Sequence, residues 1–155
     1  MAKSAITRHL EKLIYEHTSA GDWNIFSCFE VMIGISGDEI VDFITTSATN
    51  EIRCYEIKTS KSDLNSNARK TFVGDFNYFV MPQALWDDLN KHSKWEAYNG
   101  VGVLIDNGNF LECVRNAKRK HIHFAERAKI MESLVRSMSR EIKKFYKIKG
   151  YWEAF

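Results

Sequence analysis

Apolar residues recur with helical spacing near both ends of the chain. Over residues 4–18, one face of a predicted helix collects Ile6, Leu10, Leu13 and Ile14. Over residues 122–148 the spacing predicts a long amphipathic helix, whose apolar positions are Met131, Leu134, Val135, Met138, Ile142 and Phe145. We expect this second helix to dock on the rest of the protein through that apolar face.

Strand-like runs fill the middle of the chain. Runs rich in β-branched and aromatic residues predict strands at 23–33, 39–46, 51–58, 76–81, 101–105 and 110–114. The last two flank Asp106-Asn107-Gly108-Asn109, and an Asn-Gly pair between such runs is a strong hairpin signal. Residues 61–71 are read as a short helix or an ordered loop, and residues 83–92 as a short helix. The order is helix, three strands, helix, strand, helix, hairpin, helix, which predicts an α/β or α+β protein with a mixed sheet.

Composition limits the class of protein. The chain has 155 residues, of which 45% are hydrophobic and 27% charged, so we expect one domain over 1–155 with a sizeable core. No stretch approaches the roughly 18 uncharged apolar residues of a membrane helix. The N-terminus lacks the apolar segment that a secretory signal requires, so we do not expect one there. The three cysteines form no Cys-x-x-Cys pair, so we expect a reduced, cytoplasmic protein.

The net charge of +2 hides an asymmetry. Residues 1–113 carry 10 Lys/Arg and 16 Asp/Glu, whereas residues 114–150 carry 12 and 3. On a helical wheel, one face of the predicted C-terminal helix gathers Lys129, Arg136, Arg140, Lys143 and Lys147. The basic helical segment 115–150 therefore suits contact with nucleic-acid phosphates, and the alternative is a solvated helix face.

One constellation carries candidate chemistry. Side chains alternate across a strand, so Glu56 and Lys58 share a face, and a hairpin with the preceding strand places Asp42 beside Glu56. Two neighbouring carboxylates repel each other unless a cation lies between them, and Mg²⁺ is commonly held by one or two carboxylates. Asp42, Glu56 and Lys58 together suit metal-assisted phosphodiester hydrolysis. The alternative is an edge-strand ion pair with solvated charges.

The runs VDFI, CYEIKTSKSDL and YFVMP resemble the PD-(D/E)XK nuclease superfamily, which has the restriction-endonuclease-like fold. The likeness covers about residues 4–82 and is nearest to small phage-borne and MmcB-like members. It implies a mixed-sheet core in the order αβββαβ. It also implies that Asp42 and Glu56 hold Mg²⁺ or Mn²⁺ and that Lys58 positions the attacking water. Val41 stands where the motif expects a proline.

Many superfamily members add an upstream acidic residue, and two candidates stay open. Glu30, in the run FSCFEVMIG, matches a Glu-Val position of MmcB-like sequences and is the preferred candidate. Glu16 borders the apolar stripe of the first predicted helix, whereas Glu11 is expected to point the opposite way.

The expected function is a Mg²⁺-dependent deoxyribonuclease, of a kind suited to DNA repair, with Glu30 assisting Asp42, Glu56 and Lys58. Candidate nucleic-acid contacts are Lys61, Arg136, Arg140 and Lys143. Two alternatives remain: a non-catalytic DNA-binding module on the same fold, or a protein-interaction module docking through its aromatic tail 151–155. No membrane partner is expected, and a homodimer stays open.

Overall fold

The computed structural model describes residues 2–66, 71–92, 95 and 98–154. Its elements, in chain order, are α1 (Ala5–Thr18), β1 (Ile25–Ile33), β2 (Glu39–Ser47), β3 (Ile52–Ile57), α2 (Lys61–Leu64), β4 (Phe76–Pro82), α3 (Gln83–Leu89), β5 (Gly102–Asp106), β6 (Leu111–Arg115) and α4 (Phe124–Tyr146). This is the element order that the hydrophobic pattern predicts. Across the described ranges, no helix combines the length and apolar character needed to span a bilayer.

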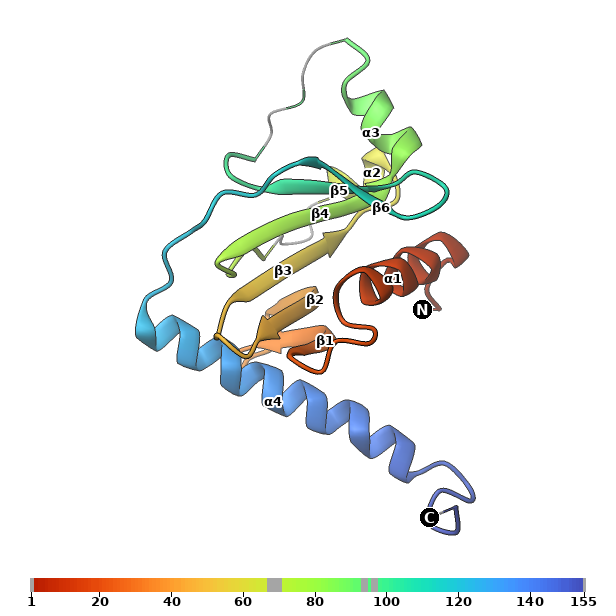
Figure 1. Cartoon of the computed structure of the whole chain (residues 1–155), viewed down its shortest axis with the longest axis vertical. Helices are drawn as coiled ribbons and strands as arrows, with labels where there is room; N and C mark the ends of the chain where they lie inside the picture. The colour runs from red at the N-terminus through yellow and green to blue at the C-terminus, as the bar shows by residue number, and fades with distance from the viewer. Residues whose placement is uncertain (1, 67–70, 93–94, 96–97, 155) are drawn as a thin grey trace.

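The strands form one mixed sheet in the order β1-β2-β3-β4-β5-β6 (Figure 1). The β1–β2, β2–β3 and β5–β6 pairs are antiparallel, whereas β3–β4 and β4–β5 are parallel. The predicted mixed sheet and both predicted hairpins are therefore confirmed. The α2 and α3 segments make the crossovers that parallel neighbours require.

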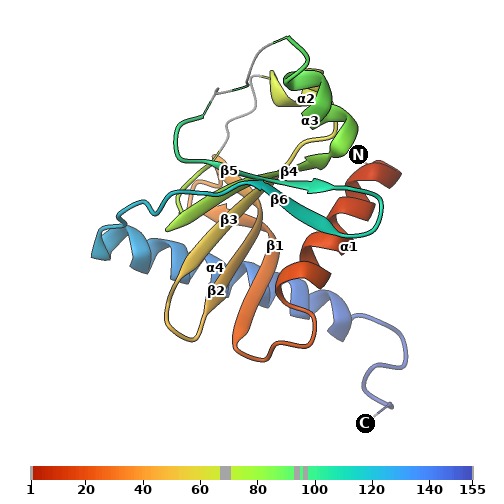
Figure 2. The ribbon, with the colours of Figure 1, turned by 45° about the horizontal axis from the view of Figure 1, so that its top comes forward.

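Helices cover both faces of the sheet (Figure 2). On one face, Leu10 and Ile14 of α1 pack against Phe43, Tyr55 and the neighbouring strands. The other face carries two clusters. The first lies under α4, where Ile130 and Leu134 contact β1, β2 and β3, and the second lies under α2 and α3. Glu56 pairs in register with Phe79 of β4, so its side chain belongs to this second face, between the two clusters.

The face of α4 that meets the sheet differs in part from the predicted one. Its buried residues are Ile130, Ser133, Leu134 and Ser137. Val135, Ile142 and Phe145, which the wheel assigns to the docking face, are exposed. The small serines fit the close approach of the helix, and the Ser133 hydroxyl is satisfied there, donating to the Lys129 carbonyl and accepting from the Gly34 N–H. The predicted docking face is therefore right in part: Leu134 is buried and Met131 and Met138 pack against the sheet, but the contact is rotated toward Ser133 and Ser137.

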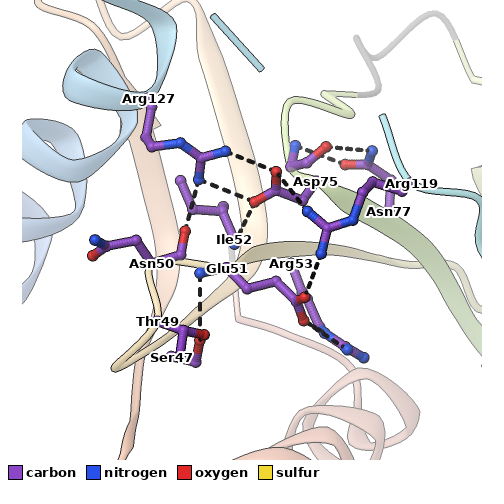
Figure 3. A network of polar contacts seen from close by, with 11 residues as sticks. Ser47, Thr49, Asn50, Glu51, Ile52, Arg53, Asp75, Asn77, Arg119 and Arg127 are labelled. Carbon is purple, nitrogen blue, oxygen red and sulfur yellow. Dashed lines mark hydrogen bonds and ion pairs between the residues drawn. The ribbon is translucent and has the colours of Figure 1, made fainter. Parts of the chain in front are cut away.

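A buried carboxylate ties the start of α4 to the sheet (Figure 3). The Asp75 side chain, 3% exposed, makes two hydrogen bonds with the Arg127 guanidinium, at 2.7 and 3.0 Å. It also accepts the Ile52 N–H at 2.8 Å, and Arg119 lies 3.8 Å away. Arg127 donates in turn to the Asn50 carbonyl. Three other segments of the chain, at Ile52, Arg119 and Arg127, therefore converge on the Asp75 charge.

The charge of Asp75 is stabilised by these partners. Burial acts to raise the pKa of its carboxyl, but hydrogen bonds from Arg127 and the Ile52 N–H, together with two guanidinium charges, hold that pKa below its ordinary value. A carboxyl with a lowered folded pKa contributes stability above its unfolded pKa. That contribution is lost as the pH falls through the folded value.

We expect Asp75→Asn to lower the free energy of unfolding by about 3 kcal/mol at pH 7, because it leaves the Arg127 charge without its partner. The difference from the unsubstituted protein should begin to shrink below about pH 4, where the Asp75 carboxyl of the unfolded chain binds a proton, and should be lost once the pH falls below the lowered native pKa. Urea unfolding over a series of pH values from 7 downward measures the difference. The matched control is Asp87→Asn, at an exposed position of α3, which should change the free energy of unfolding by less than about 0.5 kcal/mol. Equal losses in the two variants would contradict the proposed role of Asp75.

Candidate functional site

The predicted neighbours Asp42 and Glu56 do lie opposite each other. The β2–β3 ladder ends at the Phe43–Tyr55 pair, and the next residues in that register are Asp42 and Glu56. The Asp42 carboxylate accepts the Ile57 N–H at 2.8 Å, so a side chain takes the place of the next strand-to-strand hydrogen bond. The two strands part at this point, and both carboxylates stand where they separate.

Glu30 extends this row of carboxylates onto β1. The register pairs Phe29 with Phe43 and Val31 with Val41, which places Glu30 opposite Asp42. Glu30 has φ 51°, an uncommon left-handed backbone for a residue other than glycine. Phe29 and Phe43 pack on the α1 side, yet Val31 and Val41, two positions along, pack on the α4 side. In both strands, therefore, the side chains change from one face of the sheet to the other at Glu30 and Asp42.

Glu56 and Lys58 are almost completely buried side chains, 4% and 7% exposed, and their charged atoms lie 3.8 Å apart. Lys58 also lies 3.9 Å from Asp63 of α2, whose carboxylate accepts the Thr59 N–H. One carboxylate oxygen of Glu56, Oε1, has no hydrogen-bond partner among the described residues. An unsatisfied buried oxygen is unfavourable, and a cation at this position would satisfy it.

The pKa values of the two carboxyls also favour a cation at this position. Burial, followed by the neighbouring Asp42 charge, raises the pKa of Glu56 to about 8, although Lys58 and two backbone N–H groups act against the rise. Burial also raises the pKa of Asp42, against the Ile57 N–H and the Lys58 charge. A pair of carboxyls that resist ionisation side by side is the arrangement that a divalent cation stabilises.

No group of three or more His, Cys, Asp or Glu side chains among the described residues is arranged to hold a metal ion. The Glu30 carboxylate, although on the same row, is directed to Lys3. The candidate donors are therefore Asp42 and Glu56 alone. Two carboxylates fit Mg²⁺, which keeps several waters and is often bound through one or two carboxylates together with substrate phosphate.

Lys3 and Glu11 join the site, and sequence reasoning missed both. The Lys3 ammonium contacts Glu11 and lies 3.1 Å from Glu30, and its charge opposes the rise in the pKa of Asp42 that burial causes. The expectation that Glu11 points away is wrong. Glu16 lies apart from this group and pairs with Lys12. Because Lys3 precedes the helix and belongs to no motif, no sequence signal places it among carboxylates from two other elements.

The predicted nucleic-acid contacts separate into two kinds. Arg136 donates to the Gly34 carbonyl, and Arg140 donates to the Glu30 and Phe29 carbonyls at 3.0 and 3.3 Å. Arg140 thus attaches α4 to β1, and Arg136 attaches it to the turn that follows β1. Both side chains also stay partly exposed, at 43% and 36%, and line the same hollow as the lysines that follow them. Lys61 pairs with Asp88 at 2.9 Å. Lys143 remains exposed and lines a hollow of about 670 Å³ beside Lys147.

Comparison with known proteins identifies the fold and no activity. No protein-family model matches the chain, and no curated protein matches its sequence. A solved structure described as SPO1766, a protein of unknown function from Silicibacter pomeroyi, superimposes with a TM-score of 0.73. The match covers 94% of each chain at 17% sequence identity. The mixed sheet with its flanking helices is thus shared almost end to end with that protein.

The raised pKa of Glu56 predicts an alkaline loss of stability in the absence of metal. A carboxyl with a raised folded pKa binds its proton more tightly when folded, so stability falls as the pH rises from about 4.5 toward 8. We expect Glu56→Gln to raise the free energy of unfolding by about 1–3 kcal/mol at pH 8 and by less at pH 5. Urea unfolding in chelator measures it. A variant less stable than the unsubstituted protein at pH 8 would contradict this electrostatic account.

The two kinds of basic residue on α4 predict different effects on stability. Arg140→Gln should lower the free energy of unfolding by about 1–2 kcal/mol, because two backbone carbonyls of β1 lose a charged donor. Lys143→Gln, one turn further along, is the matched control and should stay within about 0.5 kcal/mol. Thermal unfolding of the two variants side by side measures the difference. If both behave like the unsubstituted protein, Arg140 does not attach the helix.

Proposed function

We propose that the chain is a metal-dependent nuclease of the PD-(D/E)XK type, acting on DNA. The observation that carries the proposal is the placement of Asp42 opposite Glu56 at the end of a strand pair, with Lys58 against Glu56. The observed order α1-β1-β2-β3-α2-β4 agrees with the αβββαβ order that the resemblance implies. It supports a restriction-endonuclease-like reading of the fold.

The side chains present fit a hydrolytic role. Asp42 and Glu56 would hold Mg²⁺ or Mn²⁺, and such an ion lowers the pKa of bound water and stabilises charge on a phosphoryl group. The Ile57 N–H fixes the Asp42 carboxylate in place. Lys58, held between Glu56 and Asp63, is in position to orient the attacking water or a phosphate oxygen. Glu30 lies on the same row, one strand away from Asp42.

The docking of α4 supports a path for the nucleic acid. Arg140 contacts the Glu30 carbonyl, so the last turns of α4 begin beside the carboxylate row. The exposed side chains of Lys143 and Lys147 continue from there on the same hollow. Contacts from such lysines to phosphates would be independent of base sequence and weakened by salt.

One observation favours a non-catalytic alternative. Lys3 already pairs with Glu30 and Glu11, and the buried Glu56 is held near Lys58, so part of the negative charge is balanced without a metal ion. A nucleic-acid-binding module with this arrangement would bind DNA and leave it intact.

Asp42→Asn, Glu56→Gln and Lys58→Ala should each reduce Mg²⁺-dependent cleavage by about a hundredfold or more, because each removes a group placed at the reacting phosphate. Fluorescently labelled duplex and single-stranded DNA, incubated with Mg²⁺ or Mn²⁺, provide the assay. Glu30→Gln should also reduce cleavage. Circular dichroism should show that each variant remains folded.

Glu16→Gln is the matched control for these variants, since Glu16 is an acidic residue of α1 that lies away from the carboxylate row. Its cleavage rate should equal that of the unsubstituted protein. If the unsubstituted protein binds DNA but cleaves neither form with either metal, the non-catalytic module replaces the nuclease as the best reading.

A further inference from the structure

An unbroken seam of apolar residues runs along α4. It consists of Ala128, Met131, Val135, Met138, Ile142 and Phe145. Their separations alternate between three and four residues, which is the a and d spacing of a heptad repeat. This spacing brings the six side chains into one narrow stripe and is typical of a helix that packs lengthwise against another helix.

Much of the seam has no partner within the described part of the chain. Val135, Ile142 and Phe145 are 63%, 47% and 58% exposed. The sheet contact centres on a neighbouring side of the helix, at Ser133 and Ser137, and reaches Met131 and Met138 only at its margin, where they are partly buried. In Figure 1, α4 packs beside β1, the side of the helix away from the strands is uncovered, and its C-terminal end reaches beyond them. Large apolar side chains left in water on one helix face mark an interaction surface.

We propose that this seam is the interface of a homodimer, in which α4 packs antiparallel against α4 of a second copy around a two-fold axis. In an antiparallel pair each a position meets a d position of the other helix. One register then aligns all six residues: Ala128 with Phe145, Met131 with Ile142, and Val135 with Met138, each pair occurring twice.

The sizes and charges along the seam fit this pairing. The smallest residue, Ala128, meets the largest, Phe145, so the layers keep a similar volume. The flanking Glu132 of one copy comes opposite Ser139 of the other, so no like charges meet there. Antiparallel helices also set opposite ends of their dipoles side by side, which is favourable. A two-fold interface requires a surface that is complementary to itself, and this seam has that property.

The cationic residues of α4 stand outside the seam. Lys129, Arg136 and Lys143 occupy one heptad position, and Arg140 and Lys147 another, and both positions lie away from the a and d stripe. A nucleic-acid strand would be attracted to those cations and would leave the apolar stripe in water. A second copy of the helix covers the stripe and leaves Lys143 and Lys147 accessible. The dimer does not rest on the nuclease proposal.

The first test is the mass of the full chain in solution. Light scattering coupled to size exclusion should give the mass of a dimer for the unsubstituted protein and that of a monomer for Ile142→Glu, whose buried charge would have no partner. Phe110→Glu, an equally exposed apolar residue in the β5–β6 turn, is the control and should remain dimeric. Circular dichroism should be the same for all three. A monomeric unsubstituted protein, or a dimeric Ile142→Glu, overturns the proposal.

The second test fixes the orientation of the helices. The exposed Cys113 is first replaced by serine, which leaves only the buried Cys28 and Cys54. With Met138→Cys, a short bismaleimide should join the two copies, since position 138 lies near the two-fold axis. With Phe145→Cys it should not, because the two cysteines would be about 25 Å apart along the helices. Mixing Ala128→Cys with Phe145→Cys should restore crosslinking. Efficient crosslinking of Phe145→Cys alone would show a parallel pair and overturn the antiparallel interface.

Discussion

The arrangement of the candidate site depends on one hydrogen bond, from the Ile57 N–H to the Asp42 carboxylate. A side chain replaces a backbone acceptor at this point, so β2 and β3 stop pairing just where their two carboxylates come level. The left-handed backbone at Glu30 lets β1 follow the same change of face. Without this interruption, backbone pairing between β2 and β3 would continue past the two carboxylates, and the Ile57 N–H would not be free to hold the Asp42 side chain.

The sequence was sufficient for what depends on short-range pattern. The alternation of side chains placed Glu56 and Lys58 on one face, and the short turn at 47–50 paired their strand with the one that bears Asp42. The contribution of Lys3 and Glu11 could not be predicted, because it depends on the angle at which α1 crosses the sheet. Periodicity specifies which side of a helix is apolar, but it does not specify where the end of that helix lies.

The long helix shows why a hydrophobic stripe can misidentify a docking face. The sheet accepts the side of α4 that carries Ser133 and Ser137, because small residues allow close approach and the Ser133 hydroxyl finds backbone partners. Leu134, Met131 and Met138 of the predicted apolar stripe pack there too, whereas Val135, Ile142 and Phe145 are left outside. Two arginines of the predicted cationic face also hold the helix to β1 and to the turn after it. A helix that serves two surfaces distributes its apolar residues between them, and a single wheel cannot assign each stripe to its partner.

The attachment of Arg140 to the edge strand β1, and of Arg136 to the turn after it, also has a consequence for solubility. An edge strand with free backbone groups is a template on which a strand of another molecule can add, and proteins block such edges to avoid aggregation. Here the blocking groups belong to a helix more than a hundred residues later in the chain. During synthesis, β1 therefore emerges long before its cover, and the nascent sheet is most vulnerable to misassembly until α4 has docked.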